Sequence, residues 1–152
     1  MAARELVEDE SVLSLGKIRE LFNQFCRPNA KLVNSRSIEP WILHRDAKQR
    51  LFGIAATRYR GLAATQRTAA RESAVDRFNA RFDSIFQRRH DCIHNCDRPR
   101  VGLQAVSDTS VRKVVDDVEF LVGRCHEVLS TEFTAYLGGL GFNRQTQNRV
   151  CM

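Results

Sequence analysis

The sequence predicts an all-α fold, a bundle of four to five helices. Apolar residues recur every three or four positions through most of the 152 residues, no stretch alternates as a strand does, and prolines and glycines separate the periodic segments. The length suits one domain, and 43% apolar with 28% charged residues excludes an intrinsically disordered chain. We expect an N-terminal lead over 1–10, a helical domain over 11–137 and a flexible tail over 138–152.

The first helix is predicted within residues 11–27. Ser11 or Ser14 can cap its beginning, and the residue before Pro28 resists the helical conformation, which ends it. One apolar stripe runs along it, formed by Val12, Leu15, Ile18, Phe22 and Phe25.

The second helical element is predicted from Pro40 to Gly61. Proline is favoured in a first helical turn, and glycine is common where a helix closes. Asp46 and Gln49 have the spacing of a capping box inside this element. We expect Trp41 to anchor the core.

Two long helices are predicted in the rest of the chain. One runs over about 65–96, before the stop at Pro99, with the stripe Val75, Phe78, Phe82, Ile85, Arg89, Cys92 and Cys96. The other begins at the caps Ser107 and Asp108 and ends at Gly138–Gly139. Its stripe is Val111, Val115, Val118, Val122, Cys125 and Leu129.

Positive charge is concentrated in the middle of the chain. Residues 45–100 hold 13 basic and 6 acidic side chains, a net charge of +7, whereas the whole sequence carries +6. Only four of the 24 basic residues are lysine, and guanidinium groups bind phosphate bidentately and stack on bases. A solvated helix face is the ordinary explanation of scattered charge, but this concentration favours a polyanion such as RNA.

The cysteines and the N-terminus indicate a cytoplasmic protein. Five cysteines without the spacing of a disulfide framework predict free thiols in a reducing compartment. The acidic start MAARELVEDE lacks the layout of a signal peptide, and no apolar run approaches the ~20 residues of a membrane span. No membrane partner is therefore expected.

Arg89 interrupts the apolar stripe of the third helix. An arginine in a core costs free energy unless it is paired or lines a cleft. It could form a buried ion pair with Asp116, Asp117 or Glu119, or the stripe could end early and leave Arg89 in solvent.

Two histidines follow this arginine, in the string RRHDCIHN. His90 and His94 are four residues apart and share one helix face, whereas Arg89 and His94 diverge by roughly 140° around a straight helix. They converge on one phosphate only if the helix ends there or a second copy supplies the complementary group. Histidine suits general acid or base catalysis near neutral pH, and a fixed guanidinium stabilises a pentacovalent phosphorane.

The string Arg89-His90-x-x-x-His94 resembles the R-x4-H motif of the HEPN superfamily, most closely the RiboL-PSP type. The resemblance is detailed over residues 75–100 and architectural over 11–137. It implies a helical bundle that forms a homodimer and acts as a metal-independent endoribonuclease, as in toxins and phage-defence effectors. It also implies a catalytic pair, Arg89 and His94, with His90 as the polar accessory residue.

Further expectations follow for partners and cofactors. RNA would contact Arg88 and Asn95 beside the catalytic residues, and cleavage by 2′-hydroxyl attack requires no cofactor or metal. A cognate antitoxin or a fused regulatory protein is a possible partner, and the alternative function is a non-catalytic dimerisation, RNA-binding or partner-binding module.

Other chemistry receives less support from the sequence. The string H-x-C-x-H-x-C at 90–96 invites a zinc site, but ligands two apart suit a strand better than a helix. Cys92 or Cys96 could act as a nucleophile beside histidine, but a free cysteine on a helix stripe is more often a small buried apolar residue. His44 and His126 are more simply histidines at the surface or at the edge of the core.

Overall fold

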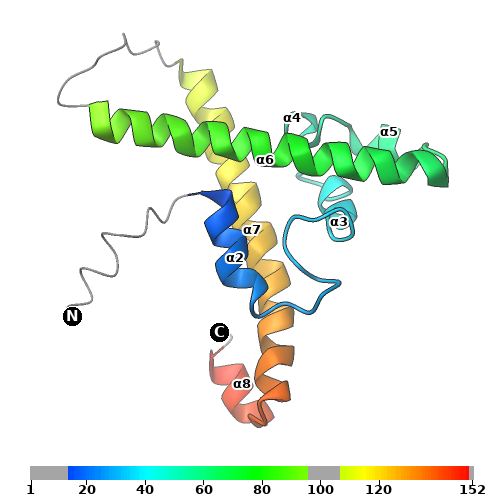
Figure 1. Ribbon diagram of the computed structural model, residues 1–152, viewed down its shortest axis with the longest axis vertical. Coiled ribbons are helices and arrows are strands. Elements are labelled where there is room, and N and C mark those ends of the chain that lie inside the picture. Colours follow the sequence, from blue (N-terminus) through cyan, green and yellow to red (C-terminus); the bar gives the residue numbers. More distant parts are fainter. Residues whose placement is uncertain (1–13, 96–106, 151–152) are drawn as a thin grey trace.

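Two crossing helices organise the fold. The computed structural model describes residues 14–95 and 107–150, without the side chains of 90–95, 148 and 150. Helix α6 (Ala64–Asn95) crosses helix α7 (Asp108–Gly139), and the last short helix lies at the far end of α7, away from the crossing (Figure 1). Within the described ranges every regular element is helical, which confirms the all-α class, whereas the HEPN-type bundle stays a prediction.

The first described helix, α2 (Leu15–Asn23), begins as predicted. The backbone N–H of Lys17 donates to Ser14 Oγ at 3.2 Å, so Ser14 is the N-cap. Leu15 is buried, and Phe25, beyond the helix end, packs edge-on against Phe133 of α7 with ring centroids 5.4 Å apart.

The second predicted element is divided into three short helices, α3 (Ile38–Ile42), α4 (Gln49–Phe52) and α5 (Ala56–Arg60). Gly53 ends α4 in the left-handed conformation (φ +72°), and Gly61 closes α5 as predicted. The predicted capping box is wrong, because the N-cap of α4 is Lys48 and no side chain caps it. The Asp46 carboxylate instead lies 3.3 Å from Arg45 Nε.

An aromatic core joins the short helices to the crossing. The Phe52 ring stacks on Phe78 of α6 with centroids 5.4 Å apart, and Phe78 contacts Phe82 one turn later. Trp41 is buried edge-on against both Phe78 and Phe120, which confirms it as a core anchor. Burial of such rings is the main source of stability in a domain of this size.

The core-facing side of α7 differs from the predicted stripe. Val111, Val115 and Val122 are 46%, 48% and 61% exposed, while Phe120 and Leu121 are buried. The larger side chains bury more apolar surface, so the helix is rotated to place them inward. The prediction that this valine row faces the core is therefore wrong for these three residues, although Val118 and Leu129 pack against the core.

A buried carboxylate ties three helices together. Asp117 of α7 is fully buried, and it accepts hydrogen bonds from Arg50 Nε of α4 and Arg81 Nε of α6, each at 2.8 Å. A buried charge requires such partners. The Asp117 junction, formed by these three residues, fixes the position of α6 against α7.

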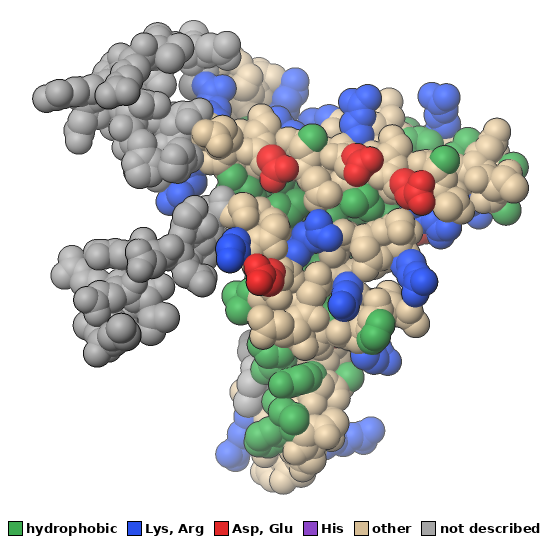
Figure 2. All heavy atoms as spheres, in the orientation of Figure 1, with side chains coloured by type: hydrophobic (Ala, Val, Ile, Leu, Met, Phe, Trp, Pro, Cys, Tyr) green, Lys and Arg blue, Asp and Glu red, His purple; other side chains and the backbone are tan. Residues whose placement is uncertain are grey.

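The predicted flexible tail contains a further helix. Beyond α7, helix α8 (Arg144–Val150) turns back beside the end of α7, and Gln147 Nε2 donates to the Phe142 carbonyl at 2.6 Å (Figure 1). Figure 2 shows apolar side chains on the surface of this end. Tyr136, Leu140 and Phe142, at the end of α7 and just beyond it, are exposed. No helix in the described part of the chain combines the length and apolarity needed to cross a membrane.

Candidate nucleic-acid interface between the two long helices

The predicted site residues all lie in the last part of α6. Arg88 and Arg89 are exposed there. The backbone of His90, His94 and Asn95 belongs to the final turns of the same helix, which is continuous as far as Asn95. The side chains of these three residues lie outside the described part of the structure, so their proximity to Arg89 stays a prediction.

Arg89 lines a cavity of about 550 Å³ between α6 and the first turns of α7. That volume is within the range of small-molecule sites. The lining residues are Arg81, Ser84, Ile85, Arg88, Arg89, Ser110, Val111, Lys113, Val114 and Val115. We call this the α6–α7 cleft. Four of its side chains are cationic and none is a carboxylate, so an anionic group is the ligand that it favours electrostatically.

The buried ion pair considered for Arg89 is absent among the described residues. Asp117, the buried acid of α7, is occupied by Arg50 and Arg81. Arg89, two turns beyond Arg81 on α6, is exposed and has no ion-pair partner among the side chains that the structure describes. Along the described part of the stripe, Phe78 and Phe82 are buried, Ile85 is half-buried and Arg89 is exposed. The last two stripe positions, Cys92 and Cys96, lie outside the described side chains, so an early end of the stripe stays a hypothesis.

The cleft also has apolar walls. Ile85 of α6 and the exposed Val111 and Val115 of α7 lie among its charged groups. Cations beside apolar surface suit a ligand with an anionic part and a flat, weakly polar part, such as a nucleotide.

The positive charge of residues 45–100 is not spread evenly around α6. Glu72, Asp76 and Asp83 are exposed, and Figure 2 shows a row of acidic side chains along this helix, with basic side chains at its edges. The net charge of this segment therefore does not correspond to one uniformly positive face along the described part of α6. The cleft is the described part of α6 where cations gather without a lining carboxylate.

Sequence reasoning missed several lining residues. Arg81 and Ser84 precede Arg89 by eight and five residues, and helical spacing places Arg81 and Ile85 on the same side as Arg89. That spacing could have identified Arg81. Ser110 and Lys113 could not be found in this way, because their contribution depends on how α7 crosses α6.

The described residues give no support to a zinc site or to a cysteine nucleophile. Among them, no group of three or more His, Cys, Asp and Glu side chains is placed to hold a metal ion. The zinc-like string at 90–96 lies outside the described side chains. Burial raises the pKa of the Cys125 thiol to about 11, which makes it a poor nucleophile, and the adjacent His126 is exposed.

Comparisons with family models, with curated proteins and with solved structures found no match to this chain.

Proposed function

We propose that the protein is a HEPN-type, metal-independent endoribonuclease that binds RNA in the α6–α7 cleft. One observation carries the proposal: Arg89 is exposed in a cationic cleft, on the helix that presents His94 five residues later. The resemblance of Arg89-His90-x-x-x-His94 to the R-x4-H motif extends the proposal to a toxin or phage-defence effector.

Each residue of the motif has a chemical task in this proposal. His94 acts as general base or acid at the 2′-hydroxyl or the leaving 5′-oxygen. Arg89 stabilises the charge of the pentacovalent phosphorane, and His90 orients the substrate or assists proton transfer. Arg88 and Asn95 contact the RNA beside them. Attack by the 2′-hydroxyl leaves a 2′,3′-cyclic phosphate and a free 5′-hydroxyl.

The continuous helix favours a site built by two copies of the chain. Because α6 stays helical through Asn95, backbone positions 89 and 94 of one copy lie about 140° apart around the helix axis. A second copy of α6 packed nearby would supply the complementary residue. The exposed Val111 and Val115 at the cleft and Val122 further along α7 offer apolar surface for such packing.

The same valines favour a second candidate function, a dimerisation or RNA-binding module without catalysis. This module would use the apolar row on α7 and the cationic cleft and would not need His94. The two functions differ in one measurable property, which is cleavage.

RNA cleavage in excess EDTA tests the proposal. The parent protein should cleave single-stranded RNA to 2′,3′-cyclic phosphate ends, and Arg89→Ala and His94→Ala should abolish cleavage while the circular dichroism spectrum and the oligomeric state are unchanged. Arg77→Ala is the matched control, because Arg77 is also an exposed arginine of α6 and does not line the cleft.

Three results would overturn parts of the proposal. Cleavage that survives both substitutions means that another site, or a contaminant, is responsible. Products with a plain 3′-hydroxyl exclude the 2′-hydroxyl mechanism. Binding without cleavage by the parent on varied RNAs leaves the non-catalytic module as the function.

A further inference from the structure

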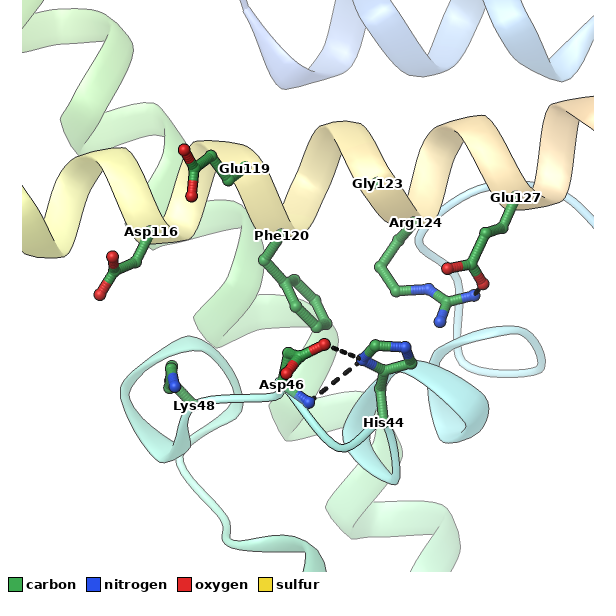
Figure 3. Close-up of a pocket in the computed structure, with 9 residues that line it drawn as sticks. All are labelled: His44, Asp46, Lys48, Asp116, Glu119, Phe120, Gly123, Arg124 and Glu127. Carbon is green, nitrogen blue, oxygen red and sulfur yellow. Dashed lines mark hydrogen bonds and ion pairs between the residues drawn. The ribbon is translucent and has the colours of Figure 1, made fainter.

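A second cavity, of about 370 Å³, lies where the segment after α3 meets the middle of α7 (Figure 3). Phe120 forms an aromatic wall, and His44 packs edge-on against it with ring centroids 5.8 Å apart. Lys48 and Arg124 also line the cavity. The volume is within the range of small-molecule sites, and aromatic walls are typical of sites that take nucleobases.

The proton of neutral His44 is fixed on one ring nitrogen. The backbone N–H of Asp46 donates to His44 Nδ1 at 3.2 Å. Since a backbone amide can only donate, Nδ1 accepts and the ring proton resides on Nε2. Figure 3 shows this second nitrogen on the side of the ring that faces Arg124, away from Asp46. His44 therefore presents a hydrogen-bond donor on that side.

Arg124 approaches His44 from the opposite wall. Its Nη2 pairs with the Glu127 carboxylate, but its buried Nε has no hydrogen-bond partner. Figure 3 shows the two side chains directed towards one another, one from α7 and one from the segment after α3. A buried N–H without a partner is unfavourable, so a ligand that brings acceptors to this guanidinium is favoured.

The charge balance selects a base instead of a phosphate. Four carboxylates line the cavity, from Asp46, Asp116, Glu119 and Glu127, against the two cations Lys48 and Arg124. This excess of negative charge repels a phosphate. A neutral ligand fits these groups if one of its edges accepts hydrogen bonds from the cations and another donates hydrogen bonds to the carboxylates.

We propose that this cavity binds a guanine base of the RNA strand, an inference that rests on the proposed function. Guanine presents two adjacent acceptors, O6 and N7, to which arginine and lysine donate in nucleic-acid complexes. Arg124 and His44 supply the donors for that edge, and the lining carboxylates accept from the N1–H and N2–H groups. Adenine places an amino donor where O6 lies in guanine, against the same donors.

The cavity is close enough to the α6–α7 cleft for one strand to occupy both. Arg50 Nη2 donates to the Lys113 carbonyl at 3.2 Å and to the Asp116 carboxylate at 3.4 Å. Lys113 lines the cleft and Asp116 lines the cavity, one helical turn apart on α7. A nucleotide near the cleaved bond can therefore place its base here.

Calorimetric titration of the parent protein with GMP, IMP, AMP, CMP and UMP tests the inference without any cleavage. GMP and IMP share O6 and N7 and should bind within a few-fold of each other, whereas AMP should bind at least about fivefold more weakly. His44→Ala should weaken GMP binding and reduce the preference for GMP over AMP. Lys48→Ala, a substitution at an exposed position, should have the same two effects. His126→Ala, an exposed histidine of α7 outside the cavity, is the control.

Equal binding of all five nucleotides, no saturable binding, or GMP binding unchanged in both cavity variants would overturn the inference. Arg89→Ala separates it from the proposed function, because this variant should lose cleavage and retain selective GMP binding. If the parent protein binds GMP selectively but cleaves no RNA, the result supports guanine binding in the cavity and contradicts only the proposed nuclease activity.

Discussion

The Asp117 junction offers the sharpest test of how the fold holds its cleft. Asp117 is fully buried and receives Arg50 Nε at 2.8 Å, Arg50 Nη2 at 2.7 Å and Arg81 Nε at 2.8 Å. Asp117→Asn keeps the volume of the side chain but removes its charge and one of its acceptor oxygens. One of the two guanidinium groups then faces an amide N–H group in the interior.

The expected cost can be worked from these contacts. Removing one partner of a buried charge pair typically destabilises a protein by about 3–5 kcal/mol. The arginine side chains are 31% and 29% exposed, and water can therefore compensate part of their lost pairing. We expect a loss of about 3 kcal/mol in the free energy of unfolding, which lowers the melting temperature of a chain of this size by roughly 6–12 °C.

Urea unfolding followed by circular dichroism measures the change. The matched control is Asp116→Asn, the same substitution at the neighbouring residue, whose side chain is 51% exposed and lies 3.4 Å from Arg50 Nη2. It should cost less than about 0.5 kcal/mol, as is usual for exposed pairs. If the two variants lose similar stability, the junction does not hold the three helices together and the reasoning is refuted.

Three further predictions concern other parts of the core. Hydrogen bonds from Arg27 lower the pKa of Glu132 below its ordinary value of 4.5, so their stabilising contribution is complete above that pH and is lost as the pH falls through the folded-state pKa. Urea titrations between pH 7 and 3 should show this loss in the parent and less of it in Glu132→Gln, and parallel curves would contradict it. Because burial raises the pKa of Cys125 to about 11, iodoacetamide at pH 8 should label this thiol far more slowly in the folded than in the urea-unfolded protein, as mapped by mass spectrometry; equal rates would count against its burial. Phe78→Ala removes a buried ring that contacts both Phe52 and Phe82 and should cost about 3–5 kcal/mol in urea unfolding, and a cost below about 1 kcal/mol would refute its place in the core.

The long helices were the most predictable part of the fold. Periodicity and caps predicted helices over about 65–96 and from 107 or 108 to 138, and the structure has Ala64–Asn95 and Asp108–Gly139. Long periodic segments average out local exceptions, and the Ser107 side chain caps α7 as expected. The region from Pro40 to Gly61 was harder to predict. A left-handed Gly53 and tertiary contacts divide it into short helices, whereas the sequence pattern presents it as one element.

Rotation around a helix axis was less predictable than its length. Of the stripe predicted on α7, Cys125 is buried and Val118 and Leu129 pack against the core, whereas Val111, Val115 and Val122 are exposed. The deciding residue is Asp117, a carboxylate that no hydrophobic pattern would place in the core. Its burial depends on two arginines from distant segments, which a local pattern does not reveal.

That arrangement also explains why Arg89 is accessible. An arginine at a position of an apolar stripe needs either a buried carboxylate or access to water. The buried carboxylate of Asp117 is already paired with Arg81, two turns before Arg89. The apolar contacts along α6 then weaken from the buried Phe82 to the half-buried Ile85, and Arg89 projects into the α6–α7 cleft. One arginine thus stabilises the crossing of the helices, and the other stays accessible to an anion from outside. In the proposed function that anion is an RNA phosphate, and His94 supplies the general acid or base for its cleavage.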